Sequence, residues 1–209
     1  AVRGCRWVFH EAAVVSVVTS VEEPELTHEV NGTGTLLVLE AARRHDVERV
    51  LFAASAAAYG RDESLPKRET DPVDAVSPYA ATKLLGEHYC SVYTATYGLP
   101  CFPLRYFNIF GPRQDPSGPY AGVISKFVDV MGAGNTPTVF GDGEQTRDFC
   151  HVADVVQANL AALDAPASEA GRPINIGTGR QTSLLDLINA LSRIYDLDVT
   201  PTFRDERPG

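Results

Sequence analysis

Short apolar runs alternate along the chain with longer amphipathic stretches. Residues 50–54 form a continuous apolar run, which is typical of a strand in a parallel sheet covered on both faces, and the mainly apolar residues 7–10 and 102–107 are predicted to be further buried strands. Stretches at about 24–45 and 78–97 have the length and apolar spacing of helices. This alternation predicts a doubly wound parallel sheet of Rossmann type, in which ligands bind outside the carboxyl ends of the strands.

The helix at 78–97 has sequence signals at both ends. Ser77 is suited to the N-cap, and Pro78 follows at the first helical position, where its missing N–H costs nothing. Gly98 is suited to the left-handed position just past the last turn, and Pro100 follows it. We therefore expect this helix to begin and end at these residues.

The earlier helix, at about 24–45, is expected to turn Val30, Leu37 and Ala41 toward the core. Asn31 also lies at a position that faces inward. Because a buried amide needs hydrogen-bond partners, Asn31 either supports the backbone of a neighbouring strand or contacts a ligand.

The chain changes character after residue 110, so we divide it into 1–110 and a smaller α/β region, 111–209, that is interleaved with the sheet. Glycines 141 and 143 flank Asp142 and predict a hairpin-like turn. The other expected elements of the second region are a helix at 122–132, a strand at 138–140, a helix from Asp154, a strand at 174–176, a helix from Ser183 with Asp186 in a capping box, and a last strand at 199–203.

Composition narrows the possible partners. The 209 residues are 44% hydrophobic, which is enough for one sizeable core. A net charge of −9 argues against nucleic acid or an anionic membrane as a partner, and no apolar run has the length of a membrane span. The positive charge is carried mainly by arginines, which suit an anionic ligand.

The four cysteines, Cys5, Cys90, Cys101 and Cys150, show no metal-binding spacing. They are predicted to be buried thiols in a reducing cytoplasm. Residues 10–14 lack the second histidine of a zinc-protease motif, so no metal site is expected.

Candidate chemistry centres on Ser55, Tyr79 and Lys83. Ser55 ends a buried strand among alanines, and the other two are four residues apart on one helix face. A nearby ammonium favours the phenolate, which makes Tyr79 a candidate general base. The same spacing also fits an ordinary helix with a packed tyrosine and a solvated lysine, but the preceding strand that ends in Ser55 favours the catalytic interpretation.

Several segments, in a fixed order, carry a family resemblance. They are residues 8–13, 31–35, Ser55 with 59–60, 77–79 with Lys83, 104–108, 110–113, 141–143 with 147–149, 175–179 and 207–209. With these segments the chain resembles extended short-chain dehydrogenases/reductases of the NAD-dependent epimerase/dehydratase family, and most closely the UDP-glucose 4-epimerase branch.

The resemblance implies an NAD-dependent nucleotide-sugar 4-epimerase that oxidises a UDP-linked hexose to a 4-keto sugar and reduces it again. Ser55, Tyr79 and Lys83 would be catalytic. The implied cofactor-binding residues are His10, Ala12, Ala13, Asn31, Tyr79, Lys83, Tyr106 and Phe107. The implied substrate-binding residues are Ser55, Asn108, Thr138, Val139, Phe140, Arg147 and Arg207. The resemblance also implies a homodimer in the cytoplasm. Its interface would be formed by the helices at 24–45 and 77–97.

Two departures from the family pattern bear on these expectations. The glycine-rich dinucleotide loop and the acidic residue that reads the adenosine ribose are not found before Trp7, so the chain resembles a piece of a longer one. The choice between NAD and NADP therefore stays open. The exact sugar stays open too, because the family's selectivity position for N-acetylated sugars is expected beyond Gly209. Glu11 stands where an apolar residue is usual, and we expect it at the rim of the site.

Two other functions remain as alternatives. Dehydratases and decarboxylases of the family carry acidic residues just after the serine, where this chain has Ala56 and Ala57. One-way chemistry, including a simple reductase, is therefore disfavoured. A non-catalytic nucleotide-binding regulator has no need of Ser55, Tyr79 and Lys83 together.

Overall fold

The chain divides into two compact units. The structure, a computed structural model, describes residues 2–118 and 121–205. One unit comprises residues 1–107 and 154–176, and the other comprises 108–153 and 177–209. The sequence placed the division after residue 110, whereas the strand β4 (Asn108–Phe110) pairs within the second unit. Residues 154–176 return to the first unit and contribute a strand to its sheet.

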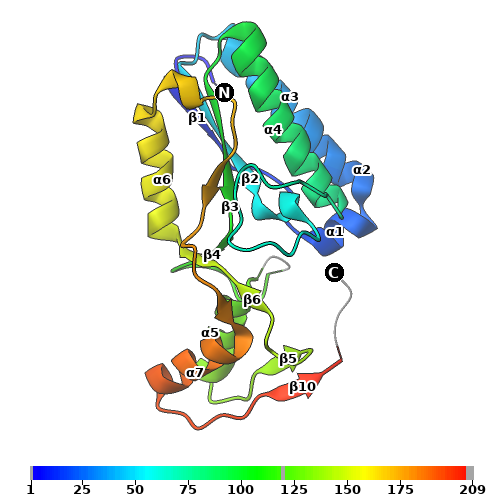
Figure 1. Cartoon of the computed structure of the whole chain (residues 1–209), viewed down its shortest axis with the longest axis vertical. Coiled ribbons are helices and arrows are strands. Elements are labelled where there is room, and N and C mark those ends of the chain that lie inside the picture. The colour runs from blue at the N-terminus through cyan, green and yellow to red at the C-terminus, as the bar shows by residue number, and fades with distance from the viewer. Residues whose placement is uncertain (1, 119–120, 206–209) are drawn as a thin grey trace. The chain divides into compact units, whose positions relative to one another are not determined.

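The first unit is built on a four-stranded parallel sheet of order β1-β2-β3-β8. Its strands are β1 (Trp7–His10), β2 (Arg49–Ser55), β3 (Cys101–Tyr106) and β8 (Ile174–Ile176). Helices α3 (Gly34–Arg44) and α4 (Pro78–Tyr97) cover one face, and α6 (Val152–Asp164) covers the other (Figure 1). This arrangement confirms the predicted doubly wound parallel sheet.

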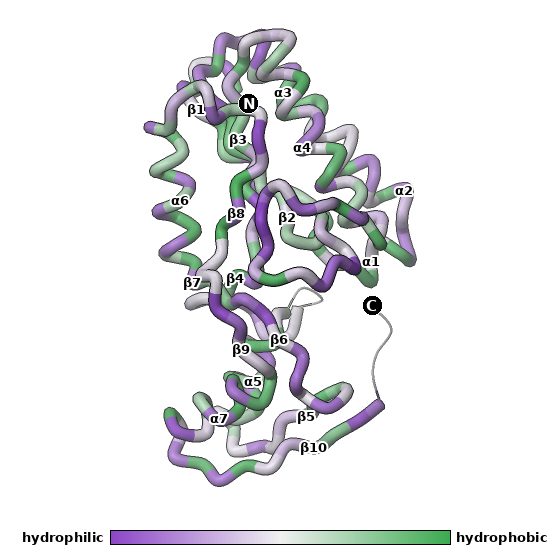
Figure 2. Tube along the Cα trace, in the orientation of Figure 1, coloured by the Kyte–Doolittle hydropathy of each residue, from purple (hydrophilic) through white to green (hydrophobic). Residues whose placement is uncertain are grey.

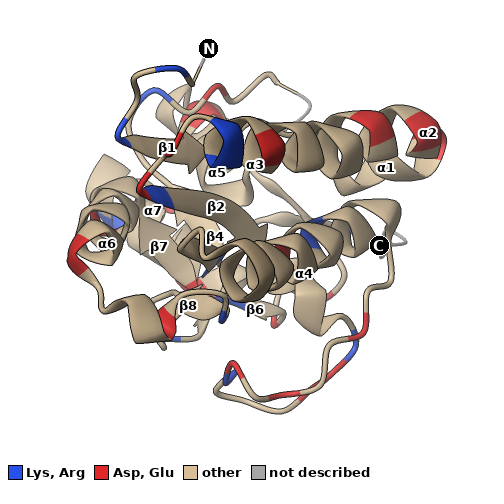
Figure 3. Ribbon diagram, turned by 90° about the horizontal axis from the view of Figure 1, so that it is seen from above, with Lys and Arg blue, Asp and Glu red and all other residues tan. Residues whose placement is uncertain are grey.

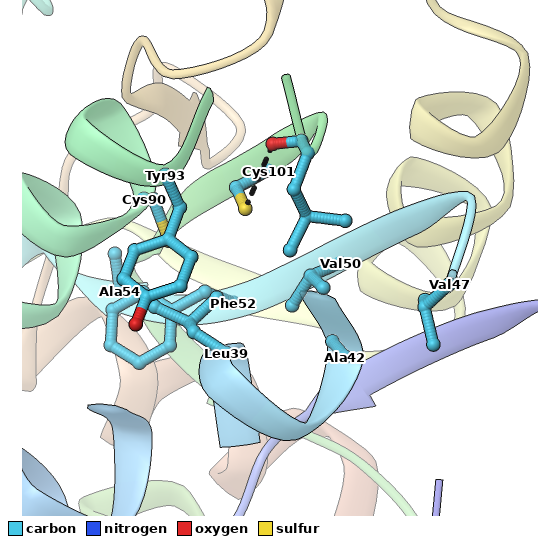
Figure 4. Close-up of a cluster of buried hydrophobic side chains, with 10 residues drawn as sticks. Leu39, Ala42, Val47, Val50, Phe52, Ala54, Cys90, Tyr93 and Cys101 are labelled. Carbon is cyan, nitrogen blue, oxygen red and sulfur yellow. Dashed lines mark hydrogen bonds between the residues drawn. The ribbon is translucent and has the colours of Figure 1, made fainter. Parts of the chain in front are cut away.

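Separate apolar clusters fill the two faces of this sheet. The cluster under α3 and α4 is drawn in Figure 4, where Phe52 and Val50 of β2 lie among side chains of both helices. The cluster under α6 comprises Leu51, Phe102, Leu104 and Ala162. Neighbouring residues of β2 thus point to opposite faces, as the two-residue period of a strand requires.

Strand β1 is less buried than its apolar sequence predicts. Trp7 and Phe9 are 37% and 44% exposed, whereas His10 is buried. The reason is that β1 lies at the edge of the four-stranded sheet and pairs only with β2 among the described strands.

The single helix predicted at 24–45 is divided. Helix α1 (Val17–Glu22) precedes α2 (Pro24–Thr27), which continues through a π-helical segment, η1 (His28–Thr33), into α3. The predicted inward face is wrong, because Val30 and Leu37 are 37% and 63% exposed and Ala41 is only half-buried. Gly32 and Ala42 are buried, and so is the row formed by Thr27, Asn31, Thr35 and Leu39. Their constant spacing of four residues reflects the wider π-helical turn, which rotates the inward face away from the one that an α-helical period predicts.

Helix α4 has the predicted ends. The Ser77 hydroxyl accepts a hydrogen bond from the Ala80 N–H at 3.2 Å, and Pro78 is the first helical residue. Gly98 ends the helix in the left-handed conformation with φ 69°. Near its middle, Gly86 allows close packing, since a Cβ there would lie 2.2 Å from Phe52 Cζ.

The second unit packs helices α5 (Val123–Gly132) and α7 (Leu184–Tyr195) against each other over an apolar cluster that includes Phe127, Met131 and Leu191. Its short strands form three pairs. These are β4 with β7 (Phe149–His151), β5 (Thr138–Phe140) with β10 (Thr202–Arg204), and β6 (Thr146–Arg147) with β9 (Thr182–Ser183).

Two predictions about this unit have different outcomes. The capping box at the start of α7 is confirmed, because Ser183 and Asp186 bond each other's backbone N–H groups. The predicted hairpin at 141–143 is wrong, because β5 pairs in parallel with β10 and β6 pairs with β9. Gly141 and Gly143, with φ 79° and 83°, turn the chain without pairing the strands on either side.

Surface and thiol features complete the fold. Cys90, Cys101 and Cys150 are buried as predicted, but Cys5 is exposed because it lies in the irregular segment before β1.

Hydrophobic and hydrophilic positions alternate along α6 (Figure 2), and α1 and α2 carry acidic residues (Figure 3). Within residues 2–118 and 121–205, no helix is long and apolar enough to cross a membrane, and no cluster of side chains could hold a metal ion.

Candidate active site

The first unit brings Ser55, Tyr79 and Lys83 together. Ser55 is the last residue of β2, and its Oγ accepts a hydrogen bond from the Ala57 N–H at 3.2 Å, which caps the short 3₁₀ helix η2 (Ala56–Tyr59). Tyr79 is the second residue of α4, and the Ser55 side chain is near enough to its phenol to act on the pKa of that group. The strand end and the helix start therefore present two hydroxyl groups to each other at the carboxyl edge of the sheet.

Lys83 lies one helical turn beyond Tyr79 and is buried, with 4% exposure. Its ammonium donates a hydrogen bond of 2.7 Å to the Ala53 carbonyl of β2 and lies 5.8 Å from the centre of the Tyr79 ring. It forms no salt bridge with any carboxylate of the described residues. The sheet thus holds the ammonium beside the tyrosine, and the solvated lysine of the alternative interpretation is excluded.

Burial controls the protonation of both groups. It lowers the pKa of Lys83 to about 8, although the charge of Glu11 acts in the opposite direction. It raises the pKa of Tyr79 above its ordinary value, with the Ser55 side chain opposing this shift. The Tyr79 pKa is thus raised, whereas the sequence argument expected it to be lowered, because burial disfavours the phenolate.

Glu11 follows β1 directly and is an exposed residue, as expected for the rim of the site. Its Oε1 accepts a hydrogen bond of 2.9 Å from the Tyr106 hydroxyl, which in turn accepts one of 2.7 Å from the Asn159 amide. Although the residue as a whole is exposed, its carboxyl group is partly shielded from water by the protein, and this raises the pKa of Glu11, while the Tyr106 hydrogen bond and the charge of Lys83 oppose the shift. Burial is also the main cause that raises the pKa of Tyr106.

Asn31 uses its side chain to hold backbone. Its Oδ1 accepts from the Val14 N–H at 2.8 Å, and its Nδ2 donates to the Val14 carbonyl at 3.0 Å and to Thr82 Oγ1 at 3.1 Å. Of the two alternatives for this amide, backbone support is the one observed, although the supported segment is the loop after β1 and not a strand. Asn31 thereby fixes the segment that follows Ala12 and Ala13.

The other predicted cofactor residues of this unit have varied surroundings. His10 is buried, with Nε2 2.9 Å from Thr35 Oγ1, and burial followed by the charge of Lys83 lowers its pKa. Ala12 is exposed and Ala13 is half-buried. The Phe107 ring lies 6.5 Å from the ring of Tyr59.

The predicted nucleotide-binding residues that the structure describes, Asn108, Thr138, Val139, Phe140 and Arg147, all belong to the second unit. The Asn108 amide and the Arg147 guanidinium are exposed and bond backbone carbonyls of Asp148 and Thr146. Val139 is buried in the core of the unit, so any ligand would meet its backbone. Arg207 lies outside the described residues.

A cavity of about 980 Å³ lies between α5 and α7 in the second unit. Its lining is mainly apolar and includes Phe110, Val128 and Ile194. Arg113 lines this cavity and forms no salt bridge among the described residues. None of the predicted substrate-binding residues that the structure describes lines it.

Sequence reasoning missed Asn159 and Glu87. Asn159 lies within α6, where its low helix propensity was an available signal. Glu87 follows Lys83 by four residues on the same face of α4 and forms a buried ion pair with Arg105. An acidic residue at that spacing, on a face that also carries Tyr79, could have been recognised.

Comparison with known proteins identifies the family. The profile of the NAD-dependent epimerase/dehydratase family matches residues 1–177. The chain belongs to this family. Among curated members, it is 43% identical over 185 residues to the putative UDP-glucose 4-epimerase of Methanocaldococcus jannaschii, covering 88% of this chain and 59% of that protein. The chain thus spans about three fifths of the length of this relative.

Solved structures of family members have the same fold. The UDP-N-acetylglucosamine 4-epimerase of Methanobrevibacter ruminantium, in complex with UDP-N-acetylmuramic acid, superposes with a TM-score of 0.95 at 36% identity, over 100% of this chain and 66% of that one. The UDP-glucose 4-epimerase of Thermus thermophilus, in complex with NAD, has a TM-score of 0.85 at 39% identity, over 98% of this chain and 66% of that one.

Proposed function

We propose that this family member is part of an NAD-dependent nucleotide-sugar 4-epimerase that acts on a UDP-linked hexose. The observation that carries the proposal is the convergence of Ser55, Tyr79 and buried Lys83 at the carboxyl edge of the sheet. The 4-epimerase names of the relatives and of both solved structures support the same reaction.

The residues of the first unit fit a dinucleotide. Lys83 uses one of its three N–H donors on Ala53, which leaves donors for the hydroxyls of a ribose. Ala12 and Ala13 carry only methyl groups after β1, on a segment that Asn31 holds in place. His10, Tyr106 and Phe107 would complete this part of the site. Bound NAD would supply a hydride acceptor and donor for the sugar C4.

The chain's own residues would move the proton. Tyr79 would take the proton of the C4 hydroxyl, while Ser55 would hydrogen-bond the same oxygen. Because the pKa of the Tyr79 phenol is raised by burial, the positive charge of Lys83 becomes more important for this step. When the 4-keto sugar turns and is reduced on its other face, Tyr79 would return the proton.

The second unit would hold the nucleotide. Arg147 and Asn108 present exposed polar groups, and a guanidinium binds diphosphate well because its charge is permanent and its donors form a fork. Thr138, Val139 and Phe140 would offer the edge of β5, and Arg207 would add a second positive charge. Strong anchoring of the nucleotide would leave the sugar free to rotate.

A dehydratase, decarboxylase or reductase is the second candidate, since the family includes dehydratases. Such one-way chemistry needs another acid or base near the serine, whereas Ala56 and Ala57 occupy the first turn of η2. A non-catalytic regulator is the third candidate, and the buried position of Lys83 beside Tyr79 argues against it.

The test is incubation of the intact protein with UDP-galactose without added NADH, followed by analysis of the product sugars. Equilibration of glucose and galactose forms supports the proposal. Loss of water or carbon dioxide would indicate the second candidate, and an unchanged sugar would indicate the third. UDP-N-acetylgalactosamine as a parallel substrate determines whether N-acetylated sugars fit.

We also propose a homodimer in a cytoplasmic setting. The interface would involve the helices at 24–45 and 77–97, and Leu37 in the first of these is 63% exposed, as an apolar side chain covered by a partner would be in a single chain. Replacing Leu37 with Glu is expected to convert a dimer to a monomer in light scattering coupled to gel filtration. A protein that is monomeric before the substitution would contradict this assembly.

A further inference from the structure

We propose that Asp148 is a positioning residue that acts through Arg147, the residue whose guanidinium would bind the diphosphate of the substrate. The inference rests on the proposed function for the identity of this ligand. The residues that carry it all belong to the second unit.

Arg147 ends a very short strand. Strand β6 has two residues, and its antiparallel pairing with β9 places Arg147 opposite Thr182 (Figure 2). A pairing of this length is marginal by itself, because strands in folded proteins most often have about five or six residues. Arg147 therefore needs a further contact that holds its backbone in one conformation.

The Asp148 side chain supplies that contact to the segment just before β9. Its Oδ1 accepts a hydrogen bond from the Thr178 hydroxyl at 2.6 Å, and its Oδ2 accepts one from the Gly179 N–H at 2.8 Å. The Thr178 N–H is shared between the two oxygens, at 3.0 and 2.9 Å. Because hydrogen bonds to an ionised carboxylate are stronger than neutral ones, Asp148 fastens the open end of the β6–β9 pairing.

The backbone of Asp148 holds a third segment. Its carbonyl accepts a hydrogen bond of 3.0 Å from the N–H of Asn108, the first residue of β4, and one of 3.4 Å from the Asn108 amide. Asp148 thus lies at the junction between β6, which pairs with β9, and β7, which pairs with β4. The two polar side chains with a proposed role toward the nucleotide, Arg147 and Asn108, are therefore both fixed at this residue.

The same arrangement leaves the positive charge of Arg147 available to a ligand. Its guanidinium is exposed, donates a hydrogen bond of 2.8 Å to the Thr146 carbonyl, and forms no salt bridge among the residues that the structure describes. Both oxygens of the neighbouring Asp148 carboxylate are bonded to residues 178–179 instead. A guanidinium that is fixed at its backbone and keeps several donors is suited to a diphosphate.

The experiment measures the binding of UDP to the intact protein by isothermal titration calorimetry, which needs no turnover. We expect Asp148→Asn to raise the Kd for UDP by about tenfold, because it removes charge-assisted hydrogen bonds and turns an amide group toward N–H donors. In the Arg147→Ala background, the same substitution should change Kd by less than about twofold, since the residue through which Asp148 acts is already lost.

Asp115→Asn is the matched control. The Asp115 carboxylate belongs to the same unit and likewise accepts hydrogen bonds from a hydroxyl and a backbone N–H, both of Ser117. Its replacement should leave the Kd for UDP unchanged. Thr178→Val removes one donor and keeps the Asp148 carboxylate, so it tests the same contact where Asp148→Asn does not fold. It should raise Kd by about threefold, and only in the presence of Arg147.

Equal effects of Asp148→Asn with and without Arg147 would overturn the inference, because a carboxylate that only stabilises the unit lowers affinity independently of Arg147. An unchanged Kd would overturn it as well. Tighter binding would also do so, because it would show that the negative charge of Asp148 repels the diphosphate.

Failure of the proposed function gives a different result. UDP binding with the expected dependence on Arg147, but without sugar interconversion, would contradict the epimerase and leave the role of Asp148 intact. A wild-type protein that does not bind UDP would contradict both. In an active enzyme, Asp148→Asn should raise the KM for UDP-galactose with little change in kcat, because the lost interaction binds substrate and transition state alike.

Discussion

Arg105 and Glu87 form a two-pronged ion pair between β3 and α4, with side chains only 4% and 7% exposed. The Arg105 guanidinium also lies 4.8 Å from the centre of the Tyr59 ring, and the Tyr59 hydroxyl donates to Asn175 on β8. The pair therefore joins the helix that carries Tyr79 and Lys83 to the sheet and to η2, which follows Ser55.

Breaking this pair from one side should be costly. We expect Glu87→Gln to lower the free energy of unfolding by about 3–5 kcal/mol, because it leaves a buried guanidinium without its counter-charge. Glu48→Gln, which breaks the exposed pair with Arg6, should cost less than about 1 kcal/mol. Urea denaturation of both variants gives the comparison, and equal losses would contradict the assigned role of the buried pair.

Tyr79→Phe should lower the turnover number of the intact enzyme by about 10²–10⁴-fold, because it removes the group that exchanges a proton with the sugar. Tyr97→Phe on the same helix, where the side chain is half-exposed, should leave turnover near the wild-type value. Sugar interconversion at the normal rate in Tyr79→Phe would exclude Tyr79 as the base.

The burial of Lys83 should appear in the pH dependence of stability. Its pKa of about 8 in the folded protein lies below the ordinary value of 10.5, so the unfolded chain binds more protons between these pH values. The free energy of unfolding of the wild type should therefore rise, relative to Lys83→Met, by up to about 3 kcal/mol as the pH increases from 8 to 10.5.

Lys126→Met is the control for this measurement, because Lys126 is exposed. The difference between wild type and Lys126→Met should not change over the same pH range. A flat difference for Lys83→Met as well, measured by urea denaturation at several pH values, would show that Lys83 keeps its ordinary pKa after folding.

Gly86→Ala should destabilise the first unit. The added Cβ would lie 2.2 Å from Phe52 Cζ, and relieving such overlap costs about 1–3 kcal/mol. Gly34→Ala in α3 is the matched control, because the nearest atom outside its own neighbours, the Glu29 carbonyl oxygen, lies at 3.7 Å. There the higher helix propensity of alanine should raise the melting temperature, and thermal unfolding of the two variants should shift in opposite directions.

The sequence by itself determined the local elements of this protein. The ends of α4 at Ser77 and Gly98 and the capping box of α7 depend on hydrogen bonds between residues a few positions apart, so they can be read from spacing. The doubly wound sheet could be predicted as well, because apolar runs and amphipathic stretches alternate along the chain in the order of its strands and helices. The alignment of Tyr79 with Lys83 follows from the helical period.

Only the tertiary structure decided which faces are buried and how the ionisable groups behave. The π-helical segment turned Val30 and Leu37 outward, and parallel pairing of β5 with β10 replaced the predicted hairpin. The Tyr79 pKa rose because desolvation depends on packing from several elements. Glu11, Tyr106 and Asn159 come together from the end of β1, from β3 and from α6, so no local pattern could have joined them in one chain of hydrogen bonds.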